Sequence, residues 1–274
     1  MSTPIKTVIL APSGRLGRAI TQAVIDHADF QLTGAVVRPQ SALAGQDIGT
    51  ALGGDPAGCK AGSALEDIAH GADIVIDASL PETTVEAAER LAVMKGPALV
   101  TGVTGFNPEQ DQRFLTASHN LPVLRAGNFS LGVAFAEALV RHAAALPARE
   151  WDIEVSETHH RMKADAPSGT ALMLARAAAA RRGVSLEEAA VYGREGTTGP
   201  RETGTIGFAV TRGGSVVGDH AVRFMADMEE LTISHRAFDR RVFANGALAA
   251  ASWMFNRGKG RANGLYSMQD VVED

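Results

Sequence analysis

The sequence predicts an α/β protein: a doubly wound parallel sheet in the N-terminal half, then an α+β region with a mostly antiparallel sheet. Three observations predict this. Short apolar runs alternate with amphipathic stretches over the first 130 residues, as in strand and helix units of a parallel sheet. A glycine-containing turn follows the first apolar run, and alternating apolar and polar residues appear later in the chain. The 274 residues suffice for two modest domains.

In the N-terminal half, Thr7–Leu10 is typical of a buried strand. Apolar residues then recur every three or four positions between Leu16 and Val24, which predicts a helix face. Further strands are expected at Leu32–Val37, Asp73–Asp77, Ala98–Thr101 and Pro122–Leu124, with a helix at Glu82–Lys95. These continuous apolar runs fit strands that are buried on both faces of one sheet.

The pattern changes near residue 128, so we expect a first domain over 1–127 and a second over 128–244. In the second, helices are predicted at Gly132–Ala145 and from Ser168 to a stop at Gly183. A strand is expected at Asp152–Val155, and alternating runs predict antiparallel strands at Ile206–Val210, Ser215–Phe224 and Glu230–His235. The apolar, partly helical end of the chain cannot be assigned to either domain by periodicity.

The charge, aromatic content and cysteine count of the chain argue against several classes of protein. The net charge of -5 and 14 aromatic residues provide no basic surface or stacking platform, so we expect no nucleic-acid partner. Cys59 is the single cysteine, and neither a secretion leader nor a membrane span is recognisable, which indicates a cytoplasmic protein.

The turn after the first strand is a candidate dinucleotide site. Gly14 and Gly17 have the spacing of the last two glycines of a dinucleotide fingerprint, with Ala11 in place of the first. Backbone N–H groups at the following helix start would face a pyrophosphate, as in Rossmann-like folds. The alternative is a plain turn that needs glycine for close packing.

Arg38 stands at the end of the second strand, where a carboxylate would bind a ribose 2′-hydroxyl. An arginine there favours a 2′-phosphate, so we expect NADPH to be preferred over NADH. The alternative is that Arg38 is only a solvated cation.

A second cluster precedes the helix near Ser168. His159, His160 and Lys163 stand just before first-turn N–H groups at Gly169 and Thr170 that could bind a carboxylate. Proton donors beside an anion pocket suit general acid catalysis. A solvated basic loop is the alternative; a metal site is disfavoured because adjacent histidines seldom reach one ion.

These residues belong to a segment, His159 to Ala171, that resembles the signature of the 4-hydroxy-tetrahydrodipicolinate reductases (dihydrodipicolinate reductases) of lysine biosynthesis. Shorter segments extend the resemblance over nearly the whole chain: Gly14–Arg18, Gly102–Phe106, Asn128–Val133, Gly193–Gly196, Arg212–Gly214, Gly218–His220 and Phe243–Ala247.

The resemblance implies an enzyme of lysine and diaminopimelate biosynthesis that reduces a cyclic dicarboxylate, 4-hydroxy-tetrahydrodipicolinate, to tetrahydrodipicolinate with NAD(P)H. It implies that His159 and Lys163 transfer protons and that His160, Gly169 and Thr170 bind substrate carboxylates. It also implies a homotetramer, with residues 245–274 packed on the cofactor domain. We expect no metal, since no ligand spacing for one is present. Implied cofactor contacts are Ala11, Pro12, Ser13, Gly14, Arg15, Leu16, Gly102, Val103, Thr104, Ala126, Gly127, Asn128 and Phe129.

Some positions depart from the family pattern. Ala11 replaces the usual first glycine, Arg38 stands where NADH-using members carry an acid, and Asp77-Ala78-Ser79 replaces Asp-Phe-Thr. Two alternatives therefore stay open: a paralogous reductase of another cyclic imine or unsaturated dicarboxylate, and a non-catalytic nucleotide-sensing regulator.

Overall fold

The chain forms two compact units. The computed structural model describes residues 3–274, except for the side chain of residue 257. One unit runs as far as Ser130 and includes Arg241–Asp274, and the other is Leu131–Arg240. We expected the domain boundaries after residues 127 and 244. In the structure the two units divide after residues 130 and 240.

The first unit contains a seven-stranded sheet in which all pairs are parallel, as the continuous apolar runs predict. Its spatial order is β12-β6-β5-β4-β1-β2-β3, so the order reverses between β1 and β4, where dinucleotides bind in such sheets. The strands are β1 (Ile5–Leu10), β2 (Phe30–Val36), β3 (Ala61–Gly62), β4 (Ile74–Asp77), β5 (Ala98–Thr101), β6 (Pro122–Arg125) and β12 (Gly264–Tyr266).

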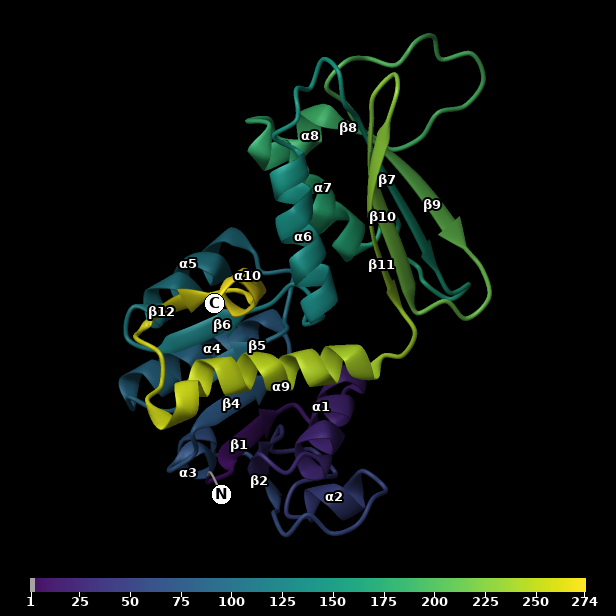
Figure 1. Ribbon diagram of the computed structural model, residues 1–274. Coiled ribbons are helices and arrows are strands. Elements are labelled where there is room, and N and C mark those ends of the chain that lie inside the picture. Colours follow the sequence, from purple (N-terminus) through teal and green to yellow (C-terminus); the bar gives the residue numbers. More distant parts are fainter. Residues whose placement is uncertain (1–2) are drawn as a thin grey trace. The chain divides into compact units, whose positions relative to one another are not determined.

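Helices cover both faces of this sheet (Figure 1). α1 (Arg15–Asp26) and α9 (Arg241–Phe255) pack together on one face. α3 (Leu65–Ala69), α4 (Pro81–Val93) and α5 (Pro108–Ser118) lie on the other, against a core that includes Val8, Val75, Leu99, Leu91 and Phe114. Shorter elements are α2 (Ile48–Ala51), η1 (Asn256–Gly258) and α10 (Met268–Glu273).

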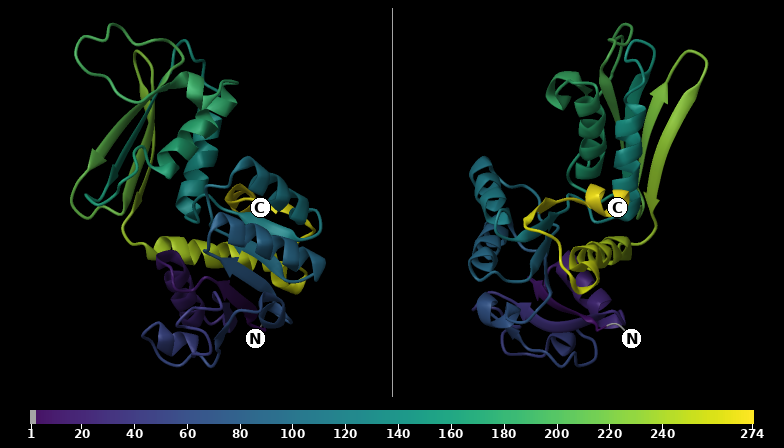
Figure 2. Two further views of the ribbon diagram at one scale, coloured as in Figure 1. Left: turned by 180° about the vertical axis from the view of Figure 1, so that it is seen from behind. Right: turned by 60° about the vertical axis from the view of Figure 1, so that its left-hand side comes forward.

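The second unit contains a five-stranded sheet in the order β11-β10-β7-β9-β8, with α6 (Leu131–Ala143) and α7 (Gly169–Arg181) on one face (Figure 2). Val140, Ile153, Leu174 and Phe224 are among the core residues between helices and sheet. The remaining elements are β7 (Asp152–His159), α8 (Leu186–Ala189), β8 (Ala190–Val191), β9 (Ile206–Arg212), β10 (Gly218–Met225) and β11 (Glu230–Ala237).

This second sheet is mixed. β10 is antiparallel to β7 and β11, whereas β9 is parallel to both β7 and β8. The antiparallel pairing expected for Ile206–Val210 was therefore wrong. The connection from β7 to β9 contains α7 and α8, and such a crossover returns the chain in the same direction, which a hairpin cannot do.

Candidate active site

The first site candidate lies at the end of β7, which continues beyond the predicted Asp152–Val155. Buried and partly exposed residues alternate along this strand, so Ile153, Val155, Glu157 and His159 share the face that the helices cover. The neighbouring strands complete the cluster, because the register sets Arg212 of β9 beside His159 and His220 of β10 beside Glu157.

Glu157 is the centre of this cluster. Its carboxylate accepts hydrogen bonds from His159 Nδ1 at 2.6 Å, from two nitrogens of Arg212 at 2.7 and 2.8 Å, and from the Ser168 backbone N–H at 3.0 Å. Burial opposes ionisation, but the bonds from Arg212, His159 and Ser168 outweigh it and hold the pKa of Glu157 below its usual value. Glu157 is therefore a buried carboxylate in its charged form.

That charge fixes how His159 is protonated. An ionised carboxylate can only accept, so Nδ1 of His159 carries a hydrogen and Nε2 is the nitrogen free to exchange a proton. Gly218 leaves room at Nε2, since a Cβ built on it would lie 3.1 Å from that atom. His159, 8% exposed, is thus held in one orientation, with its Nε2 beside a glycine.

His220 and Ser168 connect this cluster to α7. The His220 ring lies edge-on to His159, with centroids 5.0 Å apart, and its Nε2 is 2.9 Å from Ser168 Oγ. Burial, together with His159, lowers the pKa of His220 to about 4, so this imidazole is neutral at pH 7. Ser168 is the N-cap of α7 and accepts from the Ala171 N–H, which leaves the start of α7 fixed against the histidines.

Lys163 belongs to the same network through the loop that joins β7 to α7. Its ammonium donates to both oxygens of Asp165 at 2.9 and 2.8 Å and lowers the pKa of that carboxyl. Arg212 also donates to the Asp165 carbonyl at 2.7 Å, so one guanidinium ties the lysine loop to Glu157. The His160 N–H bonds the Val216 carbonyl, and Gly169 and Thr170 form the first turn of α7.

The structure thus gathers the expected residues His159, His160, Lys163, Gly169 and Thr170 around one loop and helix start. Sequence reasoning missed Glu157, Arg212 and His220 as site residues, and it considered Ser168 only as a hydroxyl donor to a carboxylate. Glu157 had a readable signal, because residues two apart in a strand share a face. Arg212 and His220 reach the site through strand pairing and carried no such local signal.

The second site candidate lies in the first unit, at the carboxyl ends of β1, β2 and β4. A cavity of about 500 Å³ is lined there by Ala11, Ser13, Gly14 and Arg38, together with the Ala78–Leu80 turn. Pro12, Arg15 and Leu16 are in the same turn and helix start but outside the lining. Other expected cofactor residues follow β5 (Gly102, Val103, Thr104) and β6 (Ala126, Gly127, Asn128, Phe129), and they are also outside this lining.

Gly14 and Gly17, the two glycines of the turn after β1, differ in the space around them. A Cβ on Gly17 would lie 2.2 Å from the Ala11 carbonyl oxygen, so packing requires that glycine. A Cβ on Gly14 would meet no described atom within 4 Å, and Gly14 has an ordinary φ of -65°. Among the described residues no side chain caps the start of α1 at Gly14. Open space beside uncapped N–H groups fits a bound pyrophosphate.

Ala11 itself adopts φ of +62°, a conformation that suits glycine. Alanine in place of the first fingerprint glycine therefore keeps the backbone conformation of the turn, although that conformation is strained for a residue with a Cβ.

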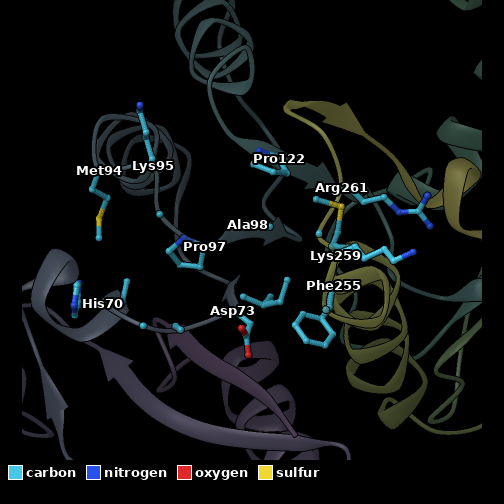
Figure 3. Close-up of a pocket in the computed structure, with 18 residues that line it drawn as sticks. His70, Asp73, Met94, Lys95, Pro97, Ala98, Pro122, Phe255, Lys259 and Arg261 are labelled. Carbon is cyan, nitrogen blue, oxygen red and sulfur yellow. The ribbon is translucent and has the colours of Figure 1, made fainter. Parts of the chain in front are cut away.

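Another cavity, of about 490 Å³, lies at the amino ends of β4, β5 and β6 between Pro97 and Phe255 (Figure 3). Since dinucleotides bind at the carboxyl ends of such strands, it is not the cofactor site.

Within residues 3–274, no helix has the length and apolar character that crossing a membrane requires. Clusters of three or more potential metal-ligating side chains are likewise absent from the described residues.

Comparisons with known proteins agree on one family. Residues 5–129 match the model described as dihydrodipicolinate reductase, N-terminus, and residues 132–272 match its C-terminus. The chain is 47% identical over 273 residues to the 4-hydroxy-tetrahydrodipicolinate reductase of Caulobacter vibrioides, covering 99% of this chain and 98% of the relative. It is 46% identical to the Cereibacter sphaeroides reductase, with 97% of each chain covered.

A solved structure of similar fold is the dipicolinate-bound dihydrodipicolinate reductase from Paenisporosarcina sp. TG-14. Its TM-score is 0.75 at 22% identity, with 98% of this chain and 99% of that chain covered.

Proposed function

The chain belongs to the dihydrodipicolinate reductase family, and we propose from its site residues how it reduces 4-hydroxy-tetrahydrodipicolinate to tetrahydrodipicolinate. It is an NAD(P)H-dependent oxidoreductase of lysine and diaminopimelate biosynthesis. The observation that carries the proposed mechanism is the buried Glu157 carboxylate, which holds Nδ1 of His159 and leaves Nε2 free beside Gly218.

Substrate binding falls to the start of α7 and the loop before it. A cyclic dicarboxylate needs donors for two anionic groups, and the first-turn N–H groups at Gly169 and Thr170 with the His160 imidazole supply one set. The Lys163 ammonium is the nearby cation, balanced by Asp165 until substrate arrives. These contacts orient the ring relative to His159.

Proton transfer is the task of His159 and Lys163. The reaction takes up a hydride and a proton and releases water, and the bound reduced nicotinamide supplies the hydride. His159 donates its Nε2 proton to the ring as negative charge develops, while the hydrogen bond to Glu157 keeps the other hydrogen on Nδ1 of His159. Lys163 lies on the same loop and takes part in this proton transfer, and its ammonium stabilises the developing charge before solvent restores the proton.

The cavity beside Gly14 fits a dinucleotide, and we assign the NADPH preference to Arg38. Arg38 lines this cavity and forms no ion pair within the described residues, whereas Arg90 in the same wall is bound in bidentate fashion by Glu66. A free guanidinium there is available to a 2′-phosphate. Glu86 also lines the wall and would repel that phosphate if Arg38 were removed.

Two measurements test these assignments. Nicotinamide oxidation with freshly generated 4-hydroxy-tetrahydrodipicolinate should be rapid, and no turnover from folded, cofactor-binding protein would exclude this substrate and leave a paralogue or a sensor. Arg38→Ala should lower kcat/KM with NADPH about tenfold, the scale of one charge-assisted bond, and leave NADH little changed. An equal loss with both cofactors would remove Arg38 as the phosphate ligand.

Homotetrameric assembly and a cytoplasmic location stay predictions. The assembly is checked by light scattering of the purified chain, where a mass near one subunit would contradict it.

A further inference from the structure

A buried carboxylate at the carboxyl end of β4 has no place in the mechanism above. Asp77 has no exposed surface and forms no ion pair with any described residue. Its Oδ1 accepts from the Ser79 N–H at 2.9 Å, and its Oδ2 accepts from Thr84 Oγ1 at 2.6 Å and from Thr101 Oγ1 at 2.8 Å. A carboxylate buried without a cation is costly, so its hydrogen bonds must satisfy it.

Thr101 connects Asp77 to the segment that follows β5. Its Oγ1 donates to Asp77 and accepts from the Val103 N–H at 3.2 Å. Burial raises the pKa of Asp77 above its usual value, and the bonds from Ser79, Thr84 and Thr101 act in the opposite sense without cancelling that rise. Each oxygen of the Asp77 side chain thus has at least one donor as a neighbour, and the Thr84 hydroxyl also lies 3.1 Å from the Leu80 carbonyl.

These donors come from segments that border the cofactor region. Ser79 belongs to the Ala78–Leu80 turn, which lines the cavity beside Gly14, and Thr84 is in the first part of α4. Val103 belongs to the expected cofactor segment after β5, and the Gly102 N–H also bonds the Asp77 carbonyl at 3.1 Å. One residue therefore holds the turns that follow two adjacent strands.

The segment after β6 packs against the turn that Asp77 holds. A Cβ on Gly102 would lie 2.4 Å from the Phe129 ring, so the ring packs directly on this glycine. Any shift of the turn after β5 would therefore displace Phe129, an expected cofactor residue. Such tight packing transmits small backbone changes rather than absorbing them.

We propose that Asp77 is a positioning residue for the dinucleotide: its carboxyl group and backbone carbonyl hold the Ala78–Leu80 turn and the Gly102–Thr104 segment in the conformation that binds the cofactor. The proposal rests on the assigned NAD(P)H-dependent function. Asp77 itself contacts no reacting group, since it is enclosed by Ser79, Thr84 and Thr101. Its effect is on cofactor affinity, through the two turns.

Thr101→Val tests this with little change of shape. The valine removes the donor to Asp77 and the acceptor for the Val103 N–H, and we expect the Kd for NADPH to rise about tenfold. Thr101→Ser keeps the hydroxyl and should restore the Kd to within about twofold of the wild type, a difference of a few tenths of a kcal/mol. KM for the dicarboxylate substrate should not change, because that site is built from the other unit.

Thr7→Val is the matched control. Thr7 is also fully buried in the first sheet, but its hydroxyl bonds the Ile5 carbonyl at 3.0 Å in the middle of β1. Both valine variants should lower the melting temperature, and a merely structural role predicts that neither changes the NADPH Kd. A wild-type Kd in Thr101→Val overturns the proposal, whereas failure of the wild-type protein to bind NADPH would overturn the assigned function instead.

Discussion

Replacing Glu157 by glutamine tests the central feature of the substrate unit. The amide has the size of the carboxylate but substitutes an NH₂ group for one oxygen. Each oxygen of Glu157 accepts two hydrogen bonds: Oε2 from His159 and Arg212, and Oε1 from Arg212 and the Ser168 N–H. Whichever way the amide turns, its N–H groups face two donors, and Arg212 loses its charged partner.

The magnitude follows from those contacts. Bonds to charged groups contribute about 1.5–3 kcal/mol each, and removing one member of a buried ion pair costs about 3–5 kcal/mol. Since the Arg212 side chain is 20% exposed, we expect the lower end, a loss of about 3 kcal/mol in the free energy of unfolding. Without the carboxylate, no charged acceptor holds the hydrogen on Nδ1 of His159, and the glutamine carries no charge to balance an imidazolium. We therefore expect kcat to fall roughly 100-fold, about 2.7 kcal/mol in barrier.

Glu154→Gln is the matched control. Glu154 lies on the opposite face of β7 and is also paired with two arginines, Arg194 at 2.9 Å and Arg201 at 3.1 Å. Urea unfolding and steady-state kinetics of both variants separate stability from catalysis. Both should be destabilised, but only Glu157→Gln should lose kcat. Equal kinetics in the two variants would refute the role of Glu157 in orienting His159.

Three further predictions follow from individual residues. Lys163→Ala should lower kcat roughly 100-fold with an unchanged NADPH Kd, and near-normal turnover would remove Lys163 from the mechanism. Ala11→Gly should raise the free energy of unfolding by about 1 kcal/mol in urea titrations, because φ of +62° strains alanine, and a destabilised variant would contradict this. His220 has a folded pKa of about 4 against 6.5, so the unfolded chain binds more protons between these values. Stability should fall by about 3 kcal/mol as pH decreases from 6.5 to 4, and His220→Gln should reduce that slope in urea titrations at several pH values.

The first sheet was predictable because its strands are buried on both faces and form continuous apolar runs. β3, β8 and β12 have only two or three residues each, too few for any periodicity to indicate them. β7 was predicted too short because polar Glu157 and His159 continue its buried face, where the pattern calls for apolar residues. The direction of β9 depends on the crossover through α7, which no feature of its own sequence encodes.

Some residues of the candidate site could likewise be predicted from the sequence, and others could not. His159, Lys163 and the start of α7 are close in sequence, so their clustering could be read directly. Arg212 is 55 residues from Glu157, and His220 is 52 residues from Ser168. Their side chains meet only because three strands align in one register, and pairing of that kind is decided by the whole sheet. The buried charge that orients His159 is therefore invisible until the register is known.

The turn after β1 shows how packing and binding can be separated once the backbone is known. The sequence allowed either explanation for both glycines, since a close-packed turn and a pyrophosphate site need the same residue. Gly17 is required by the fold, because a side chain would collide with the Ala11 carbonyl. Gly14 meets no described atom that would exclude a side chain, and its φ is open to any residue. Packing accounts for Gly17 but not for Gly14, and the open space beside Gly14 supports the proposed approach of an anion to the N–H groups of α1.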